Sequence, residues 1–225
     1  ANTVVGAAMF SGDNWRERMS STAENFQLGS DRMTEEELAD YQANKPGTFI
    51  TWHFLDEDKP DDRALLDASI MHPDVLIESD AVFWSYFDDN GGISNYEGDA
   101  WPLPDNVFSH PRSAGTAAKI LREYVRERGL LSLNEAIRKM SLMPAQTLEG
   151  FVPQMRSKGR LQVGMDADIV VFDPATVTDN ATFENANQPA NGVQTVLVNG
   201  GIVVREGELV LDAPHGRAIR RDTIE

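Results

Sequence analysis

The sequence contains no cysteine, only 4 histidines and few basic residues. Without cysteine, the chain's own residues can form no disulfide, thiolate metal site or cysteine nucleophile. No apolar run approaches the roughly 18 residues that a membrane-spanning helix needs. The 20 Lys and Arg face 36 Asp and Glu, which gives a formal net charge of −16. Because nucleic acids and anionic membranes bind basic surfaces, we expect neither as a partner.

The length of 225 residues is compatible with one large domain or two modest ones. Residues 1–10 are mildly apolar but lack the basic leader of a secretory signal, so we predict a cytoplasmic protein. The first residue is Ala1 rather than methionine, which is compatible with a processed, trimmed or partial chain.

A strand–helix–strand pattern leads into Asp80. Residues 48–55 (TFITWHFL) are β-branched and aromatic, which is typical of a buried strand. Residues 61–72 predict a helix, and a second short apolar strand is expected at 75–79. The inner face of that helix would hold Leu65, Leu66, Ala68, Ser69 and Ile70. Short links between such elements are typical of a βαβ unit, so the pattern favours a parallel sheet or barrel.

Capping boxes at Thr34–Glu37 and Ser132–Glu135 predict two helix starts. We expect the first helix to end near Asn44. The second should end before Pro144, because a proline disfavours helical backbone in the residue ahead of it, and a short helix to about residue 148 would follow. Residues 115–128 have the periodicity of another amphipathic helix.

Residues 81–110 form a long segment without periodicity, which in a compact domain is usually functional or mobile. Its aromatic residues could form an apolar lid over a substrate, or they could pack the segment against the rest of the fold. Both interpretations stay open. The residues concerned are Trp84, Tyr86, Phe87, Tyr96 and Trp101.

Beyond residue 158 the sequence changes to short strands and turns. Asn199-Gly200-Gly201 indicates a hairpin, since both central positions of a type I′ turn need positive φ. The pattern predicts an antiparallel β element, with a domain boundary that divides 1–157 from 158–225. The expected strands are 159–161, 168–172, 193–198, 202–205 and 209–211.

Asp80 is the first candidate for chemistry. A carboxylate just past the C-terminal end of a buried parallel strand lies where barrel enzymes place catalytic groups, although a capping role is an equal alternative. Arg112, in His110-Pro111-Arg112, could bind a substrate carboxylate through two parallel hydrogen bonds, although an arginine at a helix start is more often structural.

The remaining candidates carry weaker signals. His53 lies in the first predicted strand and, by itself, is more typical of a packed or hydrogen-bonded histidine than of a metal ligand. The histidines show neither HxH nor HExxH spacing, so they predict no metal site on their own. Asp166 and Asp168 flank a strand start, and we interpret them as turn and cap residues rather than ligands.

Two stretches of the tail resemble the amidohydrolase superfamily. Residues 159–174 (GRLQVGMDADIVVFDP) are similar to the stretch in which these enzymes leave their barrel and return to a small β-sandwich. Residues 198–204 (VNGGIVV) are similar to the hairpin that follows. The resemblance implies an α/β fold, namely the C-terminal portion of a (β/α)8 TIM-type barrel followed by strands of a small β-sandwich.

Three further stretches narrow the resemblance to the N-acyl-D-amino-acid deacylases, or D-aminoacylases. They are residues 77–80 (IESD), 109–116 (SHPRSAGT) and 173–184 (DPATVTDNATFE). Glu78 departs from the family pattern, in which a small residue is usual, and Ala81 replaces a frequent glycine. These departures concern specificity more than reaction type.

The resemblance implies a role for each candidate. Asp80 matches the catalytic aspartate, which takes a proton from a metal-bound water and gives it to the leaving amine. Asp80 is also a candidate weak metal ligand. Substrate binding is expected from Ser79, His110, Arg112 and His53. Zinc is the expected cofactor, with its principal ligands upstream of this chain, which would begin after roughly the sixth barrel strand.

The function that the resemblance implies is metal-dependent deacylation of a small N-acyl-D-amino acid. The chain would supply the catalytic aspartate, and a partner chain with the N-terminal half of the barrel, or a homo-oligomer, would complete the enzyme. One alternative is a cyclic-amide hydrolase similar to dihydroorotases and hydantoinases. Another is a non-catalytic fragment or assembly subunit that lacks the metal site.

Overall fold

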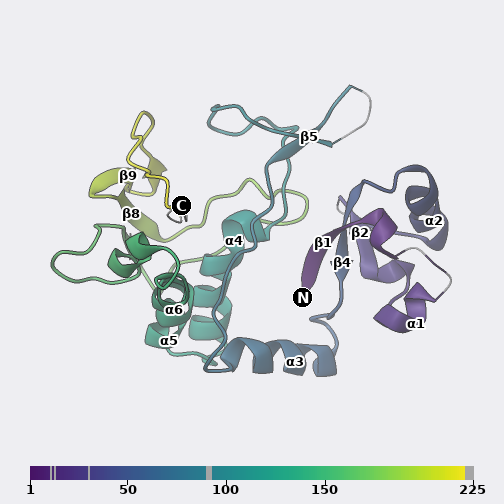
Figure 1. The fold of residues 1–225 in the computed structure, drawn as a ribbon, viewed down its shortest axis with the longest axis horizontal. Coiled ribbons are helices and arrows are strands. Elements are labelled where there is room, and N and C mark those ends of the chain that lie inside the picture. Colours follow the sequence, from purple (N-terminus) through teal and green to yellow (C-terminus); the bar gives the residue numbers. More distant parts are fainter. Residues whose placement is uncertain (11, 13, 30, 90–92, 221–225) are drawn as a thin grey trace. The chain divides into compact units, whose positions relative to one another are not determined.

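The computed structural model describes residues 1–10, 12, 14–29, 31–89 and 93–220 (Figure 1). These residues form two compact units. The first unit comprises residues 1–70 and 83–109, and the second comprises residues 71–82 and 110–225. No helix among the described residues is both long and apolar enough to cross a membrane.

The first unit is built on a four-stranded sheet in the order β1-β4-β2-β3. One of its two central strands is β4 (Phe49–His53), which confirms the strand predicted at 48–55. Every pairing in this sheet is antiparallel, so the predicted parallel βαβ unit is not borne out. The other strands are β1 (Asn2–Gly6), β2 (Phe26–Leu28) and β3 (Asp31–Arg32).

Aromatic rings form the core of the first unit. Phe10 meets Phe26 edge-on with ring centroids 4.8 Å apart, and Trp15 meets Phe26 in the same way at 5.6 Å. These rings come from elements too short to show a hydrophobic period in the sequence. Those elements are η1 (Ala7–Phe10), α1 (Trp15–Met19) and β2, and η2 (Ala23–Asn25) adds the buried Ala23 to the same core.

Helix α2 (Glu35–Asn44) confirms the first capping box and the predicted helix end. The Glu37 amide donates to Thr34 Oγ1 at 3.2 Å, and the Thr34 amide donates to Glu37 Oε2 at 2.8 Å. Helix α3 (Pro60–Met71) also forms as predicted. No residue of its expected inner face is fully buried, however, and Leu65 is 61% exposed.

The segment 81–110 is more regular than its sequence suggested. Strands β5 (Ser85–Phe87) and β6 (Ile93–Asn95) form an antiparallel hairpin, and residues 90–92 lie outside the described residues. Ser85 exchanges two backbone hydrogen bonds with Phe108, at 2.9 and 2.8 Å, and Phe87 stacks on Phe108 at 4.9 Å. Part of the aromatic set thus packs within the segment, and the lid role stays a prediction.

The second unit contains two long helical stretches. The first is α4 (Arg112–Lys119), which continues into the π-helical η3 (Ile120–Glu127). The second begins with α5 (Leu133–Ile137) at the predicted capping box, continues through the π-helical η4 (Arg138–Leu142) and ends with α6 (Met143–Leu148). The predicted break before Pro144 is wrong, because the wider π turn accommodates a proline without ending the helix.

The strand predicted at 75–79 is also wrong, since these residues belong to no strand. The amide of Ile77 donates to the carbonyl of Lys139 at 3.0 Å, so a helix carbonyl satisfies it instead of a neighbouring strand. The strand predicted at 159–161 is absent as well. There, Arg160 folds back to donate to the Lys158 carbonyl at 2.9 Å and to Glu149 at 2.7 Å.

The tail forms a four-stranded antiparallel sheet in the order β10-β9-β8-β7 (Figure 1). Asn199 and Gly200 both have positive φ, at 48° and 82°, which confirms the predicted hairpin turn. The second unit includes residues on both sides of position 157, and the domain boundary there stays a prediction. The strands are β7 (Ile169–Phe172), β8 (Val193–Val198), β9 (Gly201–Arg205) and β10 (Glu208–Leu209).

Candidate active site

Asp80 has an unusual backbone conformation. Its φ is +46°, in the left-handed region that a residue with a side chain rarely occupies. Such a conformation costs on the order of 1–3 kcal/mol, so surrounding contacts must hold it. Its side chain is 79% exposed and therefore accessible to a small molecule.

Arg112 makes the contacts that hold Asp80. Its Nη2 lies 2.8 Å from Asp80 Oδ2, and its Nε donates to the Asp80 carbonyl oxygen at 2.6 Å. The arginine is the first residue of α4, and its side chain is only 15% exposed. The structure therefore brings the two strongest sequence candidates together, with a guanidinium that binds an internal carboxylate. Binding of a substrate carboxylate by Arg112 stays a prediction.

The residues on either side of Arg112 support this arrangement. His110 is 8% exposed, its Nδ1 accepts the Arg112 amide at 3.1 Å, and its ring meets Phe183 edge-on at 5.0 Å. Ser113 Oγ accepts the Val82 amide at 3.0 Å and donates to the Val82 carbonyl at 3.1 Å. The start of α4 is thus hydrogen-bonded to the chain on both sides of Ala81. Sequence reasoning missed Ser113, although it lies inside the quoted motif.

A cavity of about 410 Å³ lies beside Asp80. It is bounded by the segment that ends at Asp80, by α4 and by the second helical stretch. Ser79 lines this cavity, in agreement with its place among the candidates, and so does Glu78, which departs from the family pattern. The lining residues are Ile77, Glu78, Ser79, Asp80, Thr116, Ala117, Met140 and Pro144.

His53 lies in the first unit, whereas the other four candidates lie in the second. Its Nε2 is 2.8 Å from Gln27 Oε1. Burial, with a contribution from the positive charge of Arg32, lowers the pKa of His53 to about 4. The imidazole is therefore neutral near pH 7, and a substrate-binding role for it stays a prediction.

The described residues contain no group of three or more His, Asp or Glu side chains placed to hold a metal ion. Asp166 and Asp168 both pair with Lys158, and Asp168 Oδ1 also accepts the Asn199 amide at 2.8 Å. That amide hydrogen bond and the Lys158 ammonium lower the pKa of Asp168. Asp168 thus holds the Asn199 turn, as predicted for a turn residue, whereas Asp166 is held by Lys158 and accepts a hydrogen bond from the Ser157 hydroxyl.

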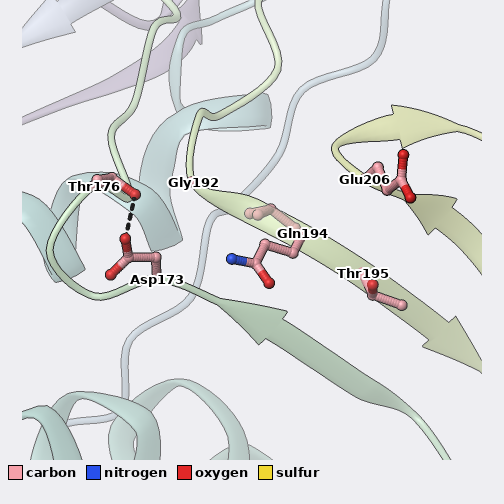
Figure 2. A pocket seen from close by; sticks show the side chains of 7 residues that line it. Asp173, Thr176, Gly192, Gln194, Thr195 and Glu206 are labelled. Carbon is pink, nitrogen blue, oxygen red and sulfur yellow. Dashed lines mark hydrogen bonds between the residues drawn. The ribbon is translucent and has the colours of Figure 1, made fainter.

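A second cavity, of about 380 Å³, lies in the tail and contains none of the candidates (Figure 2). Asp173 is its most engaged side chain. Its carboxylate accepts the Thr176 hydroxyl at 3.0 Å and the Ala175 amide at 2.9 Å, which closes the turn after β7. Glu206, on the opposite wall, belongs to the turn between β9 and β10. These side chains serve the turns, so the cavity beside Asp80 is the better candidate.

Comparison with known proteins supports the resemblance to amidohydrolases for the second half of the chain. Residues 98–204 match the model of the amidohydrolase family. A curated D-aminoacylase from Alcaligenes xylosoxydans xylosoxydans is 42% identical over 104 residues, which are 46% of this chain and 20% of that protein. The match thus spans about a fifth of the length of this curated relative.

Two solved structures are similar to the chain as well. One is a crystal structure of D-aminoacylase, with 30% identity and a TM-score of 0.59 over 82% of this chain and 32% of the other. Another is an N-acyl-D-glutamate deacylase from Bordetella bronchiseptica, complexed with zinc and a phosphonate inhibitor that mimics the tetrahedral intermediate. It has 26% identity and a TM-score of 0.56, over 93% of this chain and 40% of the other.

The barrel and the sandwich stay predictions for this chain, whose described residues form a mixed α/β structure. The sequence similarity and the solved neighbours agree on one assignment. Residues 98–204 are similar to the amidohydrolase family, and the resemblance to the N-acyl-D-amino-acid deacylases is confirmed.

Proposed function

We propose that this chain is part of an amide hydrolase that converts N-acyl-D-amino acids to a carboxylate and a free D-amino acid. The observation that carries the proposal is the two-point contact between Arg112 and Asp80 beside the 410 Å³ cavity. An exposed carboxylate in a strained backbone conformation, held by a partly buried guanidinium, is the kind of group that active sites maintain at a cost to stability.

In this proposal Asp80 transfers the proton. Its Oδ2 carries the ion pair with Arg112, so we assign proton transfer to Oδ1. The carboxylate accepts a proton from the water that attacks the amide carbonyl, and it returns that proton to the nitrogen as the carbon–nitrogen bond breaks. Free amine and carboxylate are the products.

The other candidates contribute to binding in this proposal. Ser79 lines the cavity and can donate a hydrogen bond to a substrate carbonyl or carboxylate. Arg112 is better placed than His110 to reach a substrate, because His110 is buried and its Nδ1 is used by the Arg112 amide. We assign His110 to supporting the arginine and keep His53 as a predicted contact.

Zinc is the metal in the similar N-acyl-D-glutamate deacylase structure. The side chains in the described part of this chain do not make a zinc site, because Asp80 stands without a second and third ligand group around it. The proposed enzyme therefore needs ligands beyond the described residues, from another segment, another chain or a second copy.

The test uses the full protein with zinc and compares N-acetyl-D-amino acids with their L-enantiomers and with hydantoin. Asp80→Asn keeps the side-chain shape and should lower kcat by about 10²–10⁴-fold. Asp105→Asn, an exposed acidic position in the first unit, is the matched control and should keep wild-type turnover. Wild-type turnover in Asp80→Asn would remove Asp80 from the mechanism, and preference for hydantoin would favour the cyclic-amide alternative.

A further inference from the structure

We propose that Lys139 is a positioning residue that attaches the segment 72–80, and with it Asp80, to the π-helical turn η4. The effect of Lys139 on catalysis rests on the function proposed for Asp80. The attachment itself does not, because its hydrogen bonds can be measured without turnover.

The side chain of Lys139 provides the first part of this attachment. The residue is only 2% exposed, although an ammonium group is normally found in water. Its Nζ donates to the carbonyl of Val75 at 2.8 Å and to the carbonyl of His72. A buried charge is tolerated only when polar partners replace the water that it loses, and these two carbonyls do so here. Burial also lowers the pKa of Lys139.

The main chain of Lys139 provides the second part. In η4 the Met143 amide donates to the Arg138 carbonyl, five residues back, rather than to Lys139. The next donor in that pattern would be residue 144, which is a proline and has no N–H. The Lys139 carbonyl is thereby available to the Ile77 amide, which donates to it at 3.0 Å.

One lysine thus makes three hydrogen bonds to a stretch of six residues, two from its ammonium and one to its carbonyl. This stretch ends three residues before Asp80. Met140 and Pro144, from the same helical turns, line the cavity beside Asp80. Pro144 therefore has two effects. It lines the cavity, and because it has no N–H it leaves the Lys139 carbonyl available to Ile77, which lines the same cavity.

Two substitutions test the two parts separately. Lys139→Met keeps the length of the stem but removes the donors. Pro144→Ala restores an N–H that can donate to the Lys139 carbonyl and compete with the Ile77 amide. Lys139→Arg keeps donors at the site, and Arg138→Met removes an exposed charge from the same turn and is the matched control.

The first readout is hydrogen exchange at the Ile77 amide in the full protein. Both Lys139→Met and Pro144→Ala should accelerate exchange by about 10-fold or more, because each weakens the attachment of the segment. Arg138→Met should leave the exchange rate unchanged. Pro144→Ala introduces a good helix former and should fold even if Lys139→Met does not. Unchanged exchange in Pro144→Ala would overturn the proposal.

The second readout is the division of the kinetic effect between kcat and KM for an N-acyl-D-amino acid. Lys139→Met should lower kcat by roughly 10- to 100-fold with a smaller rise in KM, because Asp80 is misplaced and Ser79 moves with the same segment, while Arg112 stays at the start of α4. Lys139→Arg should recover much of kcat. An equal loss of kcat in Arg138→Met would contradict a positioning role. If Asp80→Asn proved fully active, the proposed function would fail, while Ile77 exchange would still decide the attachment.

Discussion

The tail sheet and the segment 75–80 have similar apolar, partly β-branched sequences but satisfy their backbone in different ways. In the tail, β8 pairs with β9 through the hairpin turn and with β7 on its other side, so its backbone groups are satisfied by neighbouring strands. The segment 75–80 has no strand beside it in the described part of the chain, and a helix carbonyl accepts its Ile77 amide. Backbone groups away from water need partners, and the local topology decides which partners are available.

The two regions should also differ in what a substitution changes, namely stability in the tail and turnover around Asp80. The tail is held by many repeated ladder hydrogen bonds, of which each contributes a small share. The chain on both sides of Asp80 depends on a few specific groups, namely Lys139, Arg112 and Ser113. Substitutions in the tail should therefore act mainly on unfolding, whereas substitutions around the segment should act mainly on turnover.

The largest effect on stability is expected at Gly192, just before β8. A Cβ there would lie 2.5 Å from the Val177 nitrogen and 2.6 Å from its Cα, and φ is +79°. Gly192→Ala should therefore lower the free energy of unfolding by about 3 kcal/mol or more, since both the clash and the backbone conformation oppose the side chain. Urea denaturation of the chain measures this change.

Gly164→Ala separates the two causes. Gly164 also has positive φ, at +88°, but nothing lies within 4 Å of the position that its Cβ would take. This control should lose only about 1 kcal/mol. Equal losses at both positions would show that the close approach to Val177 adds nothing to the cost of a side chain at residue 192.

Features with a local cause could be predicted from the sequence. The capping boxes at Thr34 and Ser132 and the turn at Asn199-Gly200 were confirmed, because each depends on residues within a few positions. The segment at 75–79 was not predictable in this way. Its apolar composition is that of a buried strand, but a strand also needs a neighbour from elsewhere in the chain.

The same limit applies to the candidate site. The motifs identified Asp80 and Arg112 as separate candidates, and only the structure brings them within 2.8 Å, across 32 positions of sequence. Lys139 was missed because a buried lysine and an exposed one look alike in a sequence. The proline five residues later was interpreted as a helix end, whereas it frees the carbonyl that binds Ile77.

A smaller effect is expected at Asp80 itself, where the segment stores backbone strain. Asp80→Gly and Asp80→Ala both remove the ion pair with Arg112, but only glycine adopts φ near +46° without cost. The glycine variant should therefore be more stable than the alanine variant by about 1 kcal/mol. Urea midpoints of the two variants give this difference directly. If the two variants were equally stable, the left-handed conformation of Asp80 would not be a strained feature of the protein.

The smallest effect concerns the acid sensitivity of the tail. The Asn199 amide and Lys158 lower the pKa of Asp168 below its ordinary value near 3.8. Because the folded state then binds the proton less readily than the unfolded state, this carboxylate stabilises the fold above about pH 3.8. The contribution is lost as the pH falls further, through the pKa of the folded state. The group is partly exposed, so we expect only about 0.5 kcal/mol.

Asp168→Asn isolates this contribution. The amide cannot ionise, so the variant should be less stable than the wild type at pH 7 and should approach it as the pH falls below about 3.8. Denaturation at pH 7, 5 and 3 measures the convergence. Asp173→Asn, in the turn after β7, has no ion pair with Lys158 and serves as the control. A constant difference between wild type and Asp168→Asn at all three pH values would mean that the ionisation of Asp168 does not contribute to stability.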